Sequence, residues 1–155
     1  MKLIGFNFSK ILAERFSPIK GNLEVKANIQ VENITEEKLD IVKDDSVAKF
    51  EFKFTVDYNP QIASILFRGH AFFILDKKVQ KELMKSWKDK KIPEDTKVKL
   101  YNLILDKCNL KALMLEEELS LPSHIPFPFL KSQEEVNNKP KEQKENSSNK
   151  ANYAG

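Results

Sequence analysis

The chain has 155 residues, the size of one ordinary domain with a short tail, and 41% of them are hydrophobic, which is enough to form a core. A net charge of +3 is too small to indicate nucleic-acid binding, and four glycines argue against a glycine-rich nucleotide-binding chain. One cysteine and two histidines exclude a disulfide framework and a Cys/His metal cluster. No stretch approaches the roughly 18 apolar residues of a membrane span, and no signal-peptide pattern opens the chain, so we expect a cytoplasmic protein without metal or cofactor.

The first half of the chain has four stretches with the composition of β-strands. They are Lys2 to about Arg15, Leu23–Val31, Lys49–Tyr58 and Ile62–Leu75. The second and third alternate apolar and polar side chains, as strands with one wet face do. The fourth is almost continuously apolar, so we expect it to be buried on both faces for much of its length. Short connections, with one turn at Asp44-Asp45, favour an antiparallel meander.

Two helices are predicted in the second half. In Asp76–Lys90, apolar residues four apart predict a surface helix with one narrow buried stripe. A longer helix is predicted from near Pro93 to about Leu119, with a heptad seam of Val98, Tyr101, Leu105, Cys108, Ala112, Leu115 and Leu119. Further apolar residues lie outside the seam, more than one sheet face can cover, so we expect a second subunit on this helix. The alternative is that the shorter helix or the C-terminal segment covers them.

The C-terminal part divides into two stretches. In Leu121–Leu130, with the sequence LPSHIPFPFL, three prolines hold the chain extended, and its apolar residues should pack across something. Residues 132–155 hold only two bulky apolar side chains and should form a disordered polar tail after a domain of residues 1–131.

Few residues could carry chemistry. His70 and His124 each lie among apolar residues, and a hydrogen-bonded structural histidine is favoured over a ligand or base for both. Cys108 lies on the seam and is interpreted as a small buried hydrophobe. No nucleotide-binding loop or hydrolase motif occurs, and the lysine-rich face of Asp76–Lys90 has one aromatic residue, Trp87, which makes nucleic-acid binding the weaker hypothesis. We therefore predict a non-enzyme that binds apolar ligands, of which extended polypeptide is one.

Two stretches resemble a known family. KFEFKFTVDYNPQIASILFRGHAFFIL (Lys49–Leu75) resembles the third and fourth strands of the SecB export chaperone family. VKLYNLILDKCNLKALMLEEELSLPSHIPFPFL (Val98–Leu130) is similar to the family's long interface helix and the proline-bearing segment after it. The resemblance covers roughly Met1–Leu130 and implies an α+β fold, in which a four-stranded antiparallel sheet is backed by two helices.

The resemblance also implies a function. It implies a homotetramer, a dimer of dimers formed through the long helix, that acts as an ATP-independent holdase for unfolded or precursor polypeptides. The implied interface is Val98, Tyr101, Leu105, Cys108, Ala112 and Leu115. The implied client groove is formed by Phe16, Pro18, Ile19, Leu23, Val25, Ala27, Leu83, Met84 and Trp87. Many phenylalanines would then serve subunit contacts and client binding rather than the core.

The chain departs from the family at three places, one of which is the tail at 132–155, which lacks a clear match to the family's terminal helix. The first connection, Glu14–Asn22, is shorter than the family's crossover and carries no Trp. Ile11 and Ile65 stand approximately where the family presents acidic residues to the SecA motor, so a general or toxin-linked chaperone role is favoured over a partnership with SecA. The alternative function is binding or conversion of a small apolar ligand in a closed cavity lined by His70 or His124. A third hypothesis is a scaffold that docks through its tail.

Overall fold

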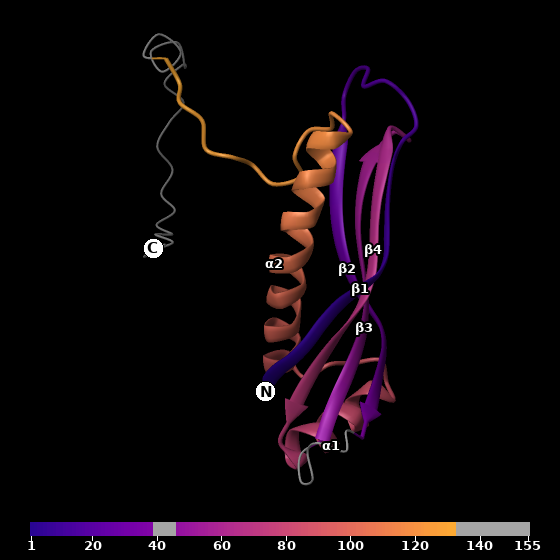
Figure 1. Cartoon of the computed structure of the whole chain (residues 1–155), viewed down its shortest axis with the longest axis vertical. Helices are drawn as coiled ribbons and strands as arrows, with labels where there is room; N and C mark the ends of the chain where they lie inside the picture. The colour runs from indigo at the N-terminus through magenta and orange to yellow at the C-terminus, as the bar shows by residue number, and fades with distance from the viewer. Residues whose placement is uncertain (39–45, 133–155) are drawn as a thin grey trace, which may run out of the picture. The chain divides into compact units, whose positions relative to one another are not determined.

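A computed structural model describes residues 1–38 and 46–132 of the chain (Figure 1). The chain divides into two units, Met1–Ile125 and Pro126–Gly155, and all helices and strands described below belong to the first. The predicted turn at Asp44-Asp45 and, apart from its first residue, the predicted tail at 132–155 lie outside the described residues. Within the described residues no helix has the length and apolar character needed to cross a membrane.

Four strands form one antiparallel sheet. They are β1 (Lys2–Arg15), β2 (Glu24–Glu37), β3 (Ser46–Asn59) and β4 (Ala63–Leu75), and their order across the sheet is β1-β4-β3-β2. The predicted meander is therefore wrong, because β1 pairs with β4 and the connection from β1 to β2 passes the end of β3 and β4. A meander would leave β4, the most apolar strand, at the edge, whereas the observed order gives it a neighbour on each side.

One face of the sheet carries the core. Alternate residues of β3 and β4 project from this face, and they include Phe50, Phe52, Phe54, Phe67 and Phe73, all nearly or completely buried. The expectation that many phenylalanines serve external contacts is thus wrong for these two strands. β4 is also not fully buried on both faces, since every second residue from Ser64 to Ile74 is partly or fully exposed to solvent. Both differences follow from the period of two residues in a strand. It places all these rings on the core face and the residues between them on the other face.

A glycine allows the aromatic rings to pack closely. Gly69 lies opposite Phe52 in the β3–β4 pairing, and the Phe52 ring stacks on Phe6 of β1 with centroids 5.1 Å apart. A methyl group at Gly69 would meet the Phe52 ring at 2.7 Å and would also overlap the carbonyl oxygen of Asn7. No other residue type fits this position without moving β1 or the ring.

Two helices cover the core face. Helix α1 (Lys77–Trp87) packs near the end of β2 and the start of β3, and α2 (Glu94–Glu118) lies along the sheet (Figure 1). The buried side chains of α2 recur every four residues and are Thr96, Leu100, Ile104, Cys108, Ala112 and Glu116. Because 3.6 residues make a turn, such a row winds slowly round the helix, which keeps it in contact with a twisted sheet. The predicted heptad seam shares only Cys108 and Ala112 with this row, and its first member, Val98, is 49% exposed.

The predicted fold class is confirmed. The first unit is an α+β fold in which a four-stranded antiparallel sheet is backed by two helices. In the second unit, the described residues Pro126–Ser132 have neither helix nor strand, as the proline spacing predicted.

Candidate polypeptide-binding groove

A second row of residues on α2 runs beside the buried row. Lys97, Tyr101, Leu105 and Asn109 are also four apart, so they lie one above another along one flank of the helix. This flank faces β2. Its two apolar members, Tyr101 and Leu105, are partly buried against the core.

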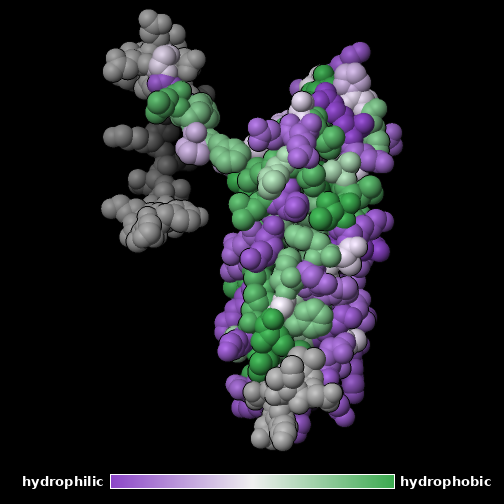
Figure 2. Space-filling view, in the orientation of Figure 1, coloured by the Kyte–Doolittle hydropathy of each residue, from purple (hydrophilic) through white to green (hydrophobic). Residues whose placement is uncertain are grey.

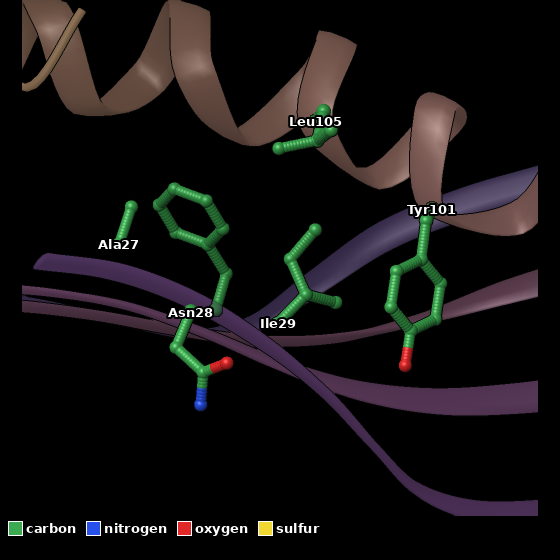
Figure 3. A pocket seen from close by; sticks show the side chains of 6 residues that line it. Ala27, Asn28, Ile29, Tyr101 and Leu105 are labelled. Atoms are coloured by element: carbon green, nitrogen blue, oxygen red, sulfur yellow. The ribbon is translucent and has the colours of Figure 1, made fainter. Parts of the chain in front are cut away.

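A pocket of about 200 Å³ lies between this flank and the sheet. It is lined by Ala27, Asn28 and Ile29 of β2, Phe54 of β3, and Tyr101 and Leu105 of α2. Figure 3 shows Tyr101 reaching from α2 toward the sheet beside Ile29, while Asn28 points away from the helix. The pocket is mainly apolar and open to solvent. We call it the α2–β2 groove.

The groove borders a free strand edge. Among the described residues, β2 pairs only with β3, so the backbone groups on its other side have no strand partner. Three consecutive β2 residues line the groove, which therefore reaches round this edge. An extended chain placed here can form backbone hydrogen bonds to β2 and bury alternate side chains against Tyr101 and Leu105.

Hydrogen bonds fix the C-terminal end of α2. The His124 ring Nδ1 lies 2.5 Å from Glu116 Oε1, and its Nε2 lies 2.9 Å from Asn109 Oδ1. The side chains of His124 and Glu116 are only 3% and 2% exposed. Each ring nitrogen of His124 thus has a hydrogen-bond partner on α2, and the contact with Glu116 is buried. The structural interpretation of His124 is confirmed.

The turn after α2 brings His124 back to the helix. Ser120 takes a left-handed conformation with φ 52°, and the Leu121 N–H donates to the Glu116 carbonyl at 2.8 Å. This is the Schellman pattern of helix termination. Arg15, at the end of β1, donates to the Leu119 carbonyl at 2.9 Å, where a cation also complements the helix dipole.

Two groups in this region have altered acidity. Tyr58 donates from its hydroxyl to the Pro122 carbonyl at 2.8 Å, and burial together with the neighbouring Glu116 carboxylate raises the pKa of Tyr58 far above its ordinary value. Burial raises the pKa of the Cys108 thiol to about 12, so this thiol stays protonated at neutral pH and is a poor nucleophile. Cys108 is a buried hydrophobe, as predicted.

The residues predicted to bind clients lie in different environments. Phe16 and Ile19 are exposed in the β1–β2 connection, and Leu23, Val25, Met84 and Trp87 are half-buried. Leu83 is completely buried in the core, so it offers no surface to a client. None of these side chains lines the α2–β2 groove, although Ala27 does.

The residues predicted to form the subunit interface are also divided. Cys108 and Ala112 have no exposed surface, because they pack under the helix against the same chain. Tyr101 and Leu105 line the groove, Leu115 is half-buried, and Val98 faces outward. Two outward residues, Leu110 and Met114, are 68% and 59% exposed. Figure 2 shows apolar residues along the face of the molecule seen in this view, interrupted by hydrophilic ones.

The groove was missed at the sequence level because its walls come from three elements. Ile29, Phe54 and Leu105 lie far apart in the sequence and meet only after the sheet forms. The row of Tyr101 and Leu105 at four-residue spacing was the available signal, and the heptad interpretation assigned it to a subunit contact. His70 alternates with Gly69 and Ala71, which face the core, so it projects from the opposite face of the sheet and lies outside the groove.

Comparison with known proteins gave one structural likeness to report. A similar solved chain is the SecB-like chaperone Rv1957 of Mycobacterium tuberculosis, in complex with a ChAD peptide from the Rv1956 HigA1 antitoxin. The two chains are 13% identical, the match covers 84% of this chain and 91% of that chain, and the TM-score is 0.48. We draw no conclusion about function from a likeness of this size. No protein-family model matches the sequence, and neither does a curated protein.

Proposed function

We propose that the protein is an ATP-independent holdase of SecB-like type that binds extended, unfolded polypeptide in the α2–β2 groove. The observation that carries this proposal is an open apolar pocket beside the free edge of β2. The resemblance of Lys49–Leu75 and Val98–Leu130 to the SecB family supports it. An open groove also fits a chain-like ligand better than the closed cavity that the small-ligand alternative requires.

Binding would combine two interactions. The unpaired backbone groups of β2 give affinity for any extended chain, independent of its sequence. Every second client side chain would face the helix and be buried between Ile29 and the flank formed by Tyr101 and Leu105. Burial of one such side chain contributes about 1.5–3 kcal/mol at most, so several groove contacts along one chain are needed for tight binding.

We also propose that the chain forms a homo-oligomer, a dimer of dimers, through the outward face of α2. The exposed side chains of Val98, Leu110 and Met114 support this, because burying them between two copies of the helix would remove apolar surface from water. The proposed partners are unfolded or precursor polypeptides in the cytoplasm, with a toxin–antitoxin system or a translocase as a further partner, and no nucleic acid.

The holdase proposal is tested with a denatured client protein in the absence of nucleotide. We expect the full chain to suppress light scattering of the aggregating client, and Leu105→Glu to abolish this suppression. The matched control is Leu110→Glu, the same change on the opposite side of the same helix. Suppression that fails for the wild-type chain at several-fold molar excess, or that survives Leu105→Glu, contradicts the proposal.

Sedimentation of the same two variants separates the groove from the interface. We expect Leu110→Glu to lower the sedimentation mass and to leave peptide binding per chain unchanged. Leu105→Glu should leave the mass unchanged. If Leu105→Glu instead lowers the mass, this residue belongs to the subunit interface that the heptad seam predicted.

A further inference from the structure

The α2–β2 groove has a second pocket next to it, on the other side of Tyr101. This pocket, of about 300 Å³, is lined by Lys90, Lys91, Ile92, Lys97 and Tyr101. Tyr101 lines both pockets, so an extended ligand that leaves the apolar pocket past Tyr101 enters this basic pocket. Three of its five lining residues are lysines, whereas the first pocket has no charged lining residue.

The fold holds the three lysines at fixed places. Lys90 has a left-handed backbone with φ 57°, and the Lys90 and Lys91 N–H groups donate to the Trp87 and Ser86 carbonyls at the end of α1. The Lys90 ammonium lies 4.4 Å from the centre of the Trp87 ring. Lys97, one turn before Tyr101 on α2, has its ammonium 5.7 Å from the Tyr101 ring. The second contact holds the Lys97 ammonium against Tyr101, which lines the pocket.

The three lysines of this pocket have no direct ion-pair partner within the part of the chain that the structure describes, although Asp89, Glu94 and Asp95 are close in sequence and exposed. The pocket also lies beside the start of α2, where Pro93 supplies no side-chain cap to the first backbone N–H groups. The positive end of the helix dipole adds to the lysine charge.

The geometry points to a more specific ligand, and this inference rests on the proposed function. We propose that the groove selects extended polypeptide segments in which apolar residues are followed or preceded by Asp or Glu side chains. The apolar residues would lie against Tyr101 and Leu105, and the carboxylates among Lys90, Lys91 and Lys97.

The spacing within such a segment follows from the helix. Leu105 and Lys97 are eight residues apart on α2, which corresponds to about 12 Å along the helix axis. An extended chain covers this length in about four residues at roughly 3.3 Å each. The carboxylate should therefore stand about four residues from the apolar side chain that packs on Leu105.

Two matched peptides test this proposal with the full chain. Both contain alternating leucine and serine with a fluorescent label. One ends in two glutamates about four residues from the central leucine, the other has glutamines instead, and each is made with the polar pair at either end. We expect the glutamate peptide to bind about fivefold more tightly in its favoured order, and the advantage to shrink in high salt, as for other exposed charge pairs.

A double variant connects the preference to the pocket. Lys91→Gln with Lys97→Gln should remove the advantage of the glutamate peptide and leave the affinity for the glutamine peptide unchanged. The control is Lys77→Gln with Lys78→Gln, which changes the net charge equally at exposed positions of α1. Equal binding of the two peptides to the wild-type chain, or a preference that survives the Lys91/Lys97 variant, overturns the inference.

The remaining outcomes are also informative. If neither peptide binds and no client is held, the holdase proposal itself is wrong, and the ligand preference falls with it. Single-stranded DNA could also displace the bound glutamate peptide, and could do so more effectively than the glutamine peptide does. The lysines would then bind nucleic acid, which overturns the inference but leaves the apolar groove as a binding site.

Discussion

The two ends of α2 contrast in how they meet the sheet. At the C-terminal end, the Glu116–His124 pair and the Arg15 hydrogen bonds close the helix against β1 and the turn that follows it. At the N-terminal end, a pocket separates the flank of the helix from β2, and lysines line its continuation. The comparison shows how a small domain keeps a groove open, because the buried row of α2 packs along the whole helix while the flank toward β2 does not pack fully near Tyr101 and Leu105.

The same contrast holds for polar groups. At the closed end, buried polar side chains have partners, as the bonds of His124 to Glu116 and Asn109 show. Elsewhere Gln80 of α1 and Thr35 of β2 have buried side-chain atoms without a hydrogen-bond partner among the described residues. Unsatisfied buried groups lower stability, so we expect the part of the fold around α1 to open more readily than the end of α2.

The largest expected effect is at the closed end. His124→Ala leaves the buried Glu116 carboxylate without its main hydrogen-bond partner and should lower the free energy of unfolding by about 3–5 kcal/mol. Lys97→Ala at the open end should change it by less than about 0.5 kcal/mol. Urea denaturation of both variants measures the contrast. A double variant, Glu116→Leu with His124→Phe, should recover most of the loss, and equal effects of His124→Ala and Lys97→Ala would show that the two ends do not differ.

Alkaline pH should weaken the buried side of α2. The folded pKa of Cys108 is raised to about 12, so the folded chain keeps a thiol proton that the unfolded chain loses near pH 8.5. The stability is therefore complete below about pH 8.5 and falls by at most about 1.4 kcal/mol per pH unit as pH rises toward the folded pKa. Cys108→Ala should flatten this decline, and Tyr58, whose pKa is also raised by burial, should leave a remainder above about pH 10. Urea titrations between pH 7 and 11 check the slope, and an identical decline in Cys108→Ala would contradict it.

The smallest expected effect compares the two helix ends directly. Ser120 and Lys90 both take left-handed backbones after their helices, a conformation that glycine adopts without strain. Ser120→Gly and Lys90→Gly should each raise the free energy of unfolding by about 0.5–1 kcal/mol, as measured by thermal unfolding. Only Lys90→Gly should weaken the preference for the glutamate peptide. A loss of that preference in Ser120→Gly would mean that the two ends are coupled.

The sequence predicted local structure well and spatial arrangement less well. Alternation in β3 places Phe50, Phe52 and Phe54 on one face, and this pattern is local. β1 lies beside β4 because this places the most apolar strand, β4, inside the sheet. No local sequence pattern predicts such a pairing between distant strands. The buried row of α2 follows the twist of the sheet, so a straight heptad seam misplaced Cys108 and Ala112.

The candidate site was predictable only in part. The family resemblance implied an apolar client surface on the first connection, the second strand and the shorter helix, and Ala27 was included. Leu83 was assigned to this surface wrongly, because the narrow apolar stripe of α1 packs into the core and leaves Leu83 completely buried. Glu116, the partner of His124, is only eight residues away in the sequence. The chain reversal that brings them together depends on the left-handed backbone of Ser120, a position where a glycine would have indicated the end of the helix.

The most direct test of the central claim is amide hydrogen exchange of the full chain with and without the bound glutamate peptide. The sheet has two free edges among the described residues, β1 and β2, and only β2 borders the groove. We predict new protection of backbone amides at Ala27–Ile29 and none along β1. Protection along β1, or saturation with peptide that leaves β2 unchanged, would contradict the assignment of the α2–β2 groove as the polypeptide-binding site.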